Sequence, residues 1–486
     1  MKSFGMCKIN FVVFCIVTFL FPLVVWAADI PQPETYFPTR EQVEKYKKPF
    51  DDPRPYLKEF GPKQVLPKEL YERLCYDEEK MKSLWTELIG FRAPDVVGKI
   101  APEIKPGKYT YQDLGKYPGL KELMWPDLYN RIKPGGPPHA GNIPEFEIIP
   151  TRQYHWALPV AEATKENLGK TKLDNNGYIV PESWIAGYPF PQPSGPFKAQ
   201  QVIYNLDKRY MAWDNNMGLT FRPIGLTKNL KIDFEGVYFI KAIRLAGRVT
   251  LGPYGWYDER AKHQGEKIAY MYNFLSPRDI AGTAFASLYY LDTGKADQLM
   301  VYVPSLRRVR KLTATDTQDP IQGQDIIYDD NDSFQQKLSP TRYPYKYEII
   351  AEREYLVPAY TLDGSEYFSS KGFECRNMKF ERRPIYVVQL TQSDPNYVYG
   401  KRIFIIDKET FLMHHMSNYD QKGRLYRTFD CNWSFFPEMG AFSYSGGMYL
   451  LRDHLDLHSG VQQFHQIPAL WSRDDVGLEA VYKKGK

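Results

Sequence analysis

Three strand-forming runs separated by two short polar turns constrain the fold of this 486-residue chain more than any other feature. The runs are Arg402–Ile406, Phe411–Tyr419 and Arg424–Cys431. The turns between them, Asp407–Thr410 and Asp420–Gly423, carry Asp and Gly, which are common in tight hairpin connections. The pattern therefore predicts an antiparallel meander.

Strand patterns dominate from about residue 200 to residue 467. Gln298–Val303 is one example, a short run that Pro304 ends. Aromatic residues make up 15% of the chain, and its many Tyr and Phe residues favour strands. Earlier in the chain, Pro67–Gly90 has apolar residues at helical spacing and one charged face, which predicts a single amphipathic helix packed on a sheet. We expect an α+β fold that is mostly β.

Composition divides the chain into five segments. They are a signal peptide (1–27), a helical and Pro-rich extension (28–150), a connector (151–199), an antiparallel β domain (200–470) and a C-terminal tail (471–486). Within the connector, Gly187–Pro193 carries three prolines in its last five residues, which excludes regular helix and central strand. We expect this segment to lie extended across a surface.

The N-terminus predicts export. Lys2 and Lys8 precede an apolar run over Phe11–Trp26, and Val25 and Ala27 give a small-residue cleavage pattern. The alternative is an uncleaved anchor. Removing the two lysines lowers the formal net charge from +5 to +3, and this near-balance argues against nucleic acid as a partner. We expect a periplasmic protein, with association with the outer membrane as a further option.

Three cysteines remain after residue 27, and an odd number cannot all pair within one chain. Cys375 and Cys431 both fall in the strand-rich region, so a bridge between them is one option in an oxidising compartment. Their spacing and that of Cys75 match no zinc pattern.

Histidines and acidic residues offer weak metal candidates. His454 and His458 are four apart, but the flanking residues favour strands, which would separate the two rings by about 13 Å. The adjacent His414 and His415 must point to opposite faces of their strand, one buried and one exposed. The acidic cluster Asp329, Asp330 and Asp332 lacks the calcium-loop pattern and is interpreted as a solvated turn. We expect no metal and no cofactor.

A basic run over Arg307–Lys311 follows the strand that ends at Pro304. It is consistent with an anionic headgroup site, with pairing to the acidic cluster, or with a charged sheet edge that discourages aggregation. The chain also lacks a Gly-x-Ser-x-Gly elbow, a P-loop and a dinucleotide fingerprint. Nothing in the pattern identifies a nucleophile, so we expect a protein that is not an enzyme.

The order of several segments resembles that of periplasmic outer-membrane lipoprotein-sorting proteins, the LolA-like group. These segments are Asp279–Ala284, Val301–Arg310 and Gly323–Asp330. The resemblance implies a curved antiparallel half-barrel that is closed by helices over a hydrophobic cavity.

The chain is more similar to a family of exported bacterial proteins, domain-of-unknown-function 1329. This second resemblance covers about residues 150–470. It rests on Gly187–Pro193, Tyr355–Tyr360 and Lys401–Asp407.

Together the resemblances imply a carrier for lipids, lipoproteins or other hydrophobic compounds, serving an envelope transporter or an outer-membrane protein. The alternatives are a non-catalytic interaction subunit of an envelope or efflux assembly and, less favoured, a hydrolase with a dispersed site. Strand position selects candidate ligand contacts, with two arginines for a headgroup: Phe285, Leu288, Leu299, Val301, Ile405, Arg307 and Arg308.

Overall fold

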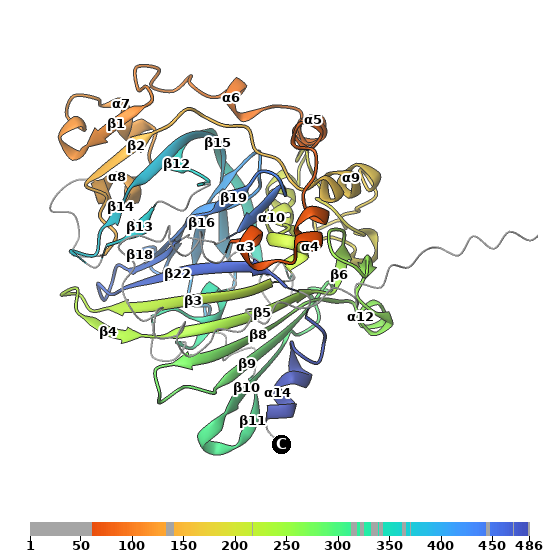
Figure 1. Ribbon diagram of the computed structural model, residues 1–486. Helices are drawn as coiled ribbons and strands as arrows, with labels where there is room; N and C mark the ends of the chain where they lie inside the picture. Colours follow the sequence, from red (N-terminus) through yellow and green to blue (C-terminus); the bar gives the residue numbers. More distant parts are fainter. Residues whose placement is uncertain are drawn as a thin grey trace, which may run out of the picture.

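A computed structural model describes most of the chain after residue 60 (Figure 1). The described ranges are 61–132, 140–215, 217–312, 318–320, 325–331, 339, 344–361, 366–369, 371–443, 448–469 and 471–484. The predicted signal peptide and Asp332 lie outside the described residues. Among the described residues, no helix is both long and apolar enough to span a bilayer.

The helices concentrate before residue 216. The α-helices are α3 (Pro62–Val65), α4 (Lys68–Arg73), α5 (Glu78–Ile89), α6 (Ala93–Val96), α7 (Gly119–Glu122), α8 (Pro126–Ile132), α9 (Leu158–Glu166), α10 (Lys198–Lys208), α11 (Ala212–Asn215), α12 (Glu259–Gln264), α13 (Tyr328–Asn331) and α14 (Leu478–Lys484). Short 3₁₀ turns are η3 (Tyr111–Asp113), η4 (Pro181–Ser183) and η5 (Pro304–Leu306).

Sixteen of the strands formed by described residues join one sheet. They are β1 (Gly107–Thr110), β2 (Glu145–Ile148), β3 (Met217–Leu226), β4 (Ile232–Glu235), β5 (Val237–Arg244), β8 (Glu266–Ser276), β9 (Ala284–Tyr290), β10 (Gln298–Val303), β11 (Arg308–Leu312), β12 (Tyr345–Pro358), β15 (Met378–Gln392), β16 (Lys401–Asp407), β17 (Met413–Tyr419), β18 (Leu425–Cys431), β21 (Met448–Asp453) and β22 (Ser459–Pro468). Small two-stranded ladders pair β6 (Ala246–Arg248) with β7 (Gly255–Trp256), β13 (Tyr367–Phe368) with β14 (Cys375–Arg376), and β19 (Ser434–Phe436) with β20 (Ala441–Ser443).

The order along the sheet is β1-β2-β15-β16-β17-β18-β21-β22-β3-β5-β8-β9-β10-β11, with β12 also beside β15 and β4 beside β3. Its ladders are antiparallel except for β2 with β15. The sheet is twisted and curved (Figure 1). The α+β, mostly-β fold class with a large curved antiparallel sheet is therefore confirmed.

Both faces of the sheet are covered over its central strands. One face shares a core with α5, α9 and α10, which we call the main core. The opposite face packs under β1, β2, α7 and α8 in the outer core, and under α12 and α14 in a smaller terminal core. Successive residues of β16 illustrate the alternation, since Phe404 and Ile406 enter the main core while Ile405 enters the outer core.

The predicted meander is present as β16, β17 and β18, and the predicted strand before Pro304 is β10. The basic run forms β11, which ends the strand order and has largely exposed side chains. The basic run thus forms a charged sheet edge, which is one of the three alternatives that the sequence left open. His414 and His415 do face opposite sides, but the expectation that one is exposed is wrong, because both faces are covered and both rings are buried.

The single helix predicted over Pro67–Gly90 is wrong in one respect, because it is two helices. Helix α4 ends at Arg73, and the N–H of Tyr76 leaves the helical pattern to donate to the carbonyl of Glu438. Asp77 then caps α5 by accepting a hydrogen bond from the N–H of Lys80 at 2.8 Å. A long-range contact and a new cap therefore override the continuous apolar periodicity.

The Gly187–Pro193 segment is irregular, as expected, but it is not laid across a surface. Tyr188 is buried in the main core against the rings of Trp85 and Trp156. Gly187 has φ +78°, and a Cβ there would approach the backbone N of Thr164 to 2.5 Å. The close packing on α9 explains why the segment begins with glycine.

The optional bridge between Cys375 and Cys431 does not form, and both residues are buried free thiols. Arg131 contacts the Cys375 sulfur at 3.5 Å and the carboxylate of Asp430 at 2.9 Å, which places Cys375 on the outer-core face. Cys431 follows Asp430 in β18 and so points to the opposite face, into the main core. The sheet itself separates the two sulfurs.

A buried ion cluster ties the N-terminal segments to the meander. Arg383 on β15 donates to Asp407 at 2.7 Å and to Glu409 at 2.6 Å, and all three side chains are inaccessible or nearly so. Glu409 also accepts the backbone N–H groups of Ala93 and Tyr154, both at 2.9 Å. The Glu409 carboxylate therefore binds two segments that precede it by more than 200 residues in the sequence.

We predict that Arg383→Met strongly destabilises the protein, because it leaves buried carboxylates without their compensating charge. The expected loss in free energy of unfolding is about 3–5 kcal/mol, measured by urea denaturation. The matched control is Arg424→Met, whose exposed ion pair with Asp420 should contribute little. Equal losses for the two variants would contradict this role for Arg383.

We further predict that protein lacking residues 1–27 contains three thiols and no disulfide. Cys75 is half-buried, whereas Cys375 and Cys431 are buried, so only Cys75 should react with Ellman's reagent before denaturation. Burial raises the pKa of the Cys75 thiol, so this reaction should be slow. Three reactive thiols after denaturation are expected, and an intact mass lower by two hydrogens would contradict the prediction.

Candidate functional site

The predicted ligand contacts do not line one cavity. Phe285, Leu299 and Val301 share the main-core face of β9 and β10. Leu288 points to the terminal core and Ile405 to the outer core. Arg307 and Arg308 lie at the turn into the exposed edge strand β11. The structure therefore distributes this set over three cores and an edge.

Large side chains fill the helix-covered face where the half-barrel resemblance implies a deep cavity. Trp85, Trp156 and Trp433 are among the largest fully buried residues and belong to the main core. Aromatic rings pack edge-on or tilted between them, for example Tyr154 on Tyr360 with centroids 4.5 Å apart. Space for a ligand must be sought where this packing is interrupted.

The packing is interrupted beside β3, β4, β21 and β22, where a pocket opens to solvent. Gly460 on β22 pairs in register with Gly225 on β3, so two residues without side chains lie next to each other. A Cβ added at Gly460 would find no heavy atom nearer than 3.9 Å. A Cβ at Gly225 would instead meet Asp233 Oδ1 at 2.8 Å and Phe234 Cβ at 3.1 Å, so the open part of the floor lies at Gly460.

Apolar side chains surround this floor. Leu451 is the cross-strand partner of Gly460, and Phe234 is that of Gly225. Tyr449 and Ile326 complete the apolar lining from the main core. A concave site with an apolar wall and a few polar groups is the usual form of a small-ligand site.

The pocket has a polar rim. His458 Nδ1 lies 2.9 Å from Asp325 Oδ2, and both side chains are about one-third exposed. Burial raises the pKa of Asp325, and the neighbouring Asp453 raises it further, while His458 opposes the shift. The rim therefore offers an ionisable pair at the mouth of an apolar space.

The interpretation of the acidic cluster as a solvated turn is wrong. Asp329 and Asp330 are buried, and they accept hydrogen bonds from the hydroxyls of Tyr397 at 2.8 Å and Tyr399 at 2.7 Å. Arg427 lies 3.3 Å from Asp330 and supplies a counter-charge. These contacts anchor α13 and so hold the preceding Asp325–Ile326 over the pocket.

The two histidines of the metal candidate do not converge. His454 Nε2 lies 3.0 Å from the hydroxyl of Thr428, whereas His458 pairs with Asp325. The sequence analysis also kept the two rings apart, but it did not identify Asp325 as the partner of His458, and it missed the pocket. The available indication was Gly225 and Gly460 inside strand patterns, since glycine in a strand often marks a close approach or an open site.

Comparisons with known proteins confirm the predicted family. A family model described as a protein of unknown function (DUF1329) matches residues 140–467. An uncharacterized protein of Pseudomonas aeruginosa, PA3922, is 24% identical over 311 residues, which are 61% of this chain. The alignment spans 65% of that relative's length.

Solved structures are also similar to the chain. A DUF1329 family protein from Desulfovibrio piger is 13% identical, with a TM-score of 0.40, over 57% of this chain and 94% of that one. A putative outer membrane lipoprotein-sorting protein domain from Vibrio parahaemolyticus is 16% identical, with a TM-score of 0.39, over 60% of this chain and 97% of that one.

Proposed function

This chain belongs to the DUF1329 family of proteins of unknown function, and on that premise we propose that it is an exported binding protein for a small hydrophobic molecule. The ligand binds in the pocket beside β3, β4, β21 and β22. The observation that carries the proposal is Gly460, whose missing side chain leaves open space beside the apolar Leu451.

Burial of apolar surface supplies the affinity. A methylene group removed from water contributes roughly 0.8 kcal/mol, so one short acyl chain against Leu451, Phe234 and Ile326 gains enough to bind without a catalytic group. The packed main core restricts the ligand to a single chain or a compact ring system. The Asp325–His458 pair would face the polar end of such a molecule.

The N-terminal export pattern supports a periplasmic location for this binding. A protein that shields one apolar molecule there could deliver it to an envelope transporter or to an outer-membrane protein. Such delivery needs an entrance at the protein surface, and the pocket opens to solvent at its polar rim. An interaction subunit without a ligand is the rival, and it predicts that the pocket can be filled without consequence.

We expect Gly460→Leu to fill the pocket and to weaken binding of the apolar fluorophore N-phenyl-1-naphthylamine at least tenfold. Binding is measured by fluorescence titration of protein lacking residues 1–27, with decanoate as a competing ligand. Gly460→Ala, which adds one methyl, should have a smaller effect.

The matched control is Gly115→Leu, at an exposed glycine whose added Cβ also meets no neighbour. It should bind the fluorophore like the native protein. Thermal melting of each variant reports whether the fold is retained. Undiminished binding by a folded Gly460→Leu variant would refute the pocket as the ligand site.

A further inference from the structure

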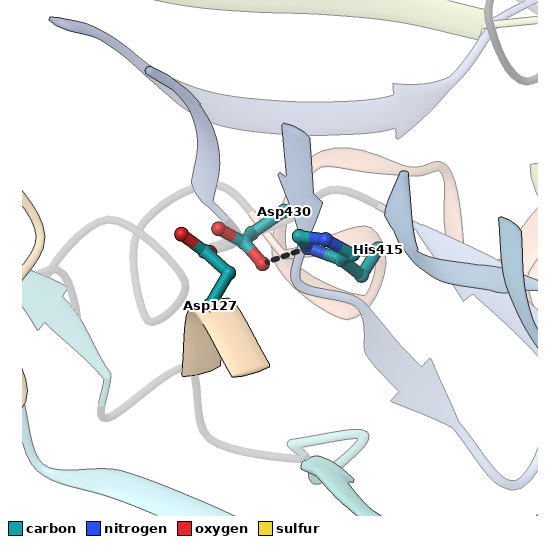
Figure 2. A group of neighbouring side chains, drawn as sticks. All are labelled: Asp127, His415 and Asp430. Atoms are coloured by element: carbon teal, nitrogen blue, oxygen red, sulfur yellow. Dashed lines mark hydrogen bonds and ion pairs between the residues drawn. The ribbon is translucent and has the colours of Figure 1, made fainter. Parts of the chain in front are cut away.

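A second polar group lies on the opposite face of the sheet, where α8 covers β17 and β18 (Figure 2). His415 and Ser417 are two residues apart in β17 and so share that face. Asp430 is the cross-strand partner of His415 on β18, so its side chain meets the imidazole directly. The meander thus brings a hydroxyl, an imidazole and a carboxylate together.

Two hydrogen bonds arrange these groups in series. Asp430 Oδ1 lies 2.9 Å from His415 Nδ1, and His415 Nε2 lies 2.8 Å from the Ser417 hydroxyl. With Nδ1–H donating to the carboxylate, Nε2 is the basic nitrogen and accepts from the serine. This is the order of nucleophile, base and orienting acid that activates a hydroxyl.

The surroundings fix the imidazole and keep the carboxylate ionised. The ring of Trp125 packs on His415 with centroids 4.9 Å apart. Arg131 at 2.9 Å and Arg452 at 2.7 Å bind Asp430 and hold the pKa of its carboxyl far below the usual range. Asp127 on α8 lies beside Asp430 (Figure 2) and pairs with the same Arg452. Because two guanidinium groups already balance the two carboxylates, the group does not favour a divalent cation.

Two residues that contact this group, Arg452 and Trp125, carry buried hydrogen-bond donors without an acceptor. Arg452 is 1% exposed, yet its Nε and Nη1 have no hydrogen-bond partner, and neither has Nε1 of Trp125. Buried donors without acceptors are costly and rare. Donors of this kind stabilise negative charge that develops on an oxygen within their reach. Ser417 is only half-buried, as are its neighbours Ile403 and Tyr419, so a substrate carbonyl can approach from solvent.

We propose that Ser417, His415 and Asp430 form a catalytic triad that hydrolyses short-chain carboxylic esters. The Ser417 oxygen bonds to the ester carbonyl carbon as its proton passes to His415 Nε2. The carbon–oxygen bond to the alcohol then breaks, and the alcohol leaves with that proton. Water attacks the acyl-serine with His415 as base, releasing the carboxylic acid and restoring the serine. Short esters are favoured because neither the pocket beside Gly460 nor the small one lined by Trp125 and Asp430 includes Ser417.

Covalent labelling of the serine tests the proposal directly, because it does not depend on turnover. A fluorophosphonate probe should label the native protein, with the adduct mapped to Ser417 by peptide mass spectrometry. Ser417→Ala should abolish the adduct, and His415→Gln should slow its formation at least tenfold.

The matched control is Ser183→Ala, at a serine that bonds to backbone groups rather than to an imidazole. It should label like the native protein. Hydrolysis of p-nitrophenyl acetate should fall at least tenfold in Ser417→Ala, in which every histidine that could react on its own is retained. Melting temperature and N-phenyl-1-naphthylamine binding should be unchanged in that variant. Absence of an adduct at Ser417 in folded native protein, or unchanged hydrolysis by Ser417→Ala, would overturn the proposal.

Discussion

Both faces of the sheet are buried along its central strands, so strands such as β9 and β16 supply side chains to two cores at once. Residues that alternate along a strand enter the main core and the outer or terminal core in turn. A polar residue in such a strand cannot reach water and needs a partner within the protein. Arg383 with Asp407, Arg427 with Asp330 and His415 with Asp430 meet this requirement with charge.

Burial of both faces also determines where a ligand pocket or a reactive group of side chains can form. On the main-core side, space opens where Gly460 lacks a side chain, and this space is the proposed ligand pocket. On the other side, the partner that a buried His415 requires also orients its ring toward Ser417. The pocket and the triad are thus separate consequences of one architecture.

Local pattern was sufficient for the β16–β18 meander and for β10, because short turns and strand-forming runs are encoded by neighbouring residues. Local pattern did not predict the structure correctly where residues distant in the sequence determine it. The split of the helix over Pro67–Gly90 depends on Glu438, and the burial of Asp330 depends on Tyr399 and Arg427. The register that pairs Gly225 with Gly460 also lies beyond local pattern.

The central claim is that the glycine-floored pocket holds an apolar molecule. Its most direct test is a crystal structure of protein lacking residues 1–27 with a terminally brominated fatty acid, in which anomalous scattering locates the bromine. We expect a bromine peak beside Gly460, between Leu451 and Ile326. Bromine found only outside this pocket, or a pocket closed by repacked side chains with no bound chain, would contradict it.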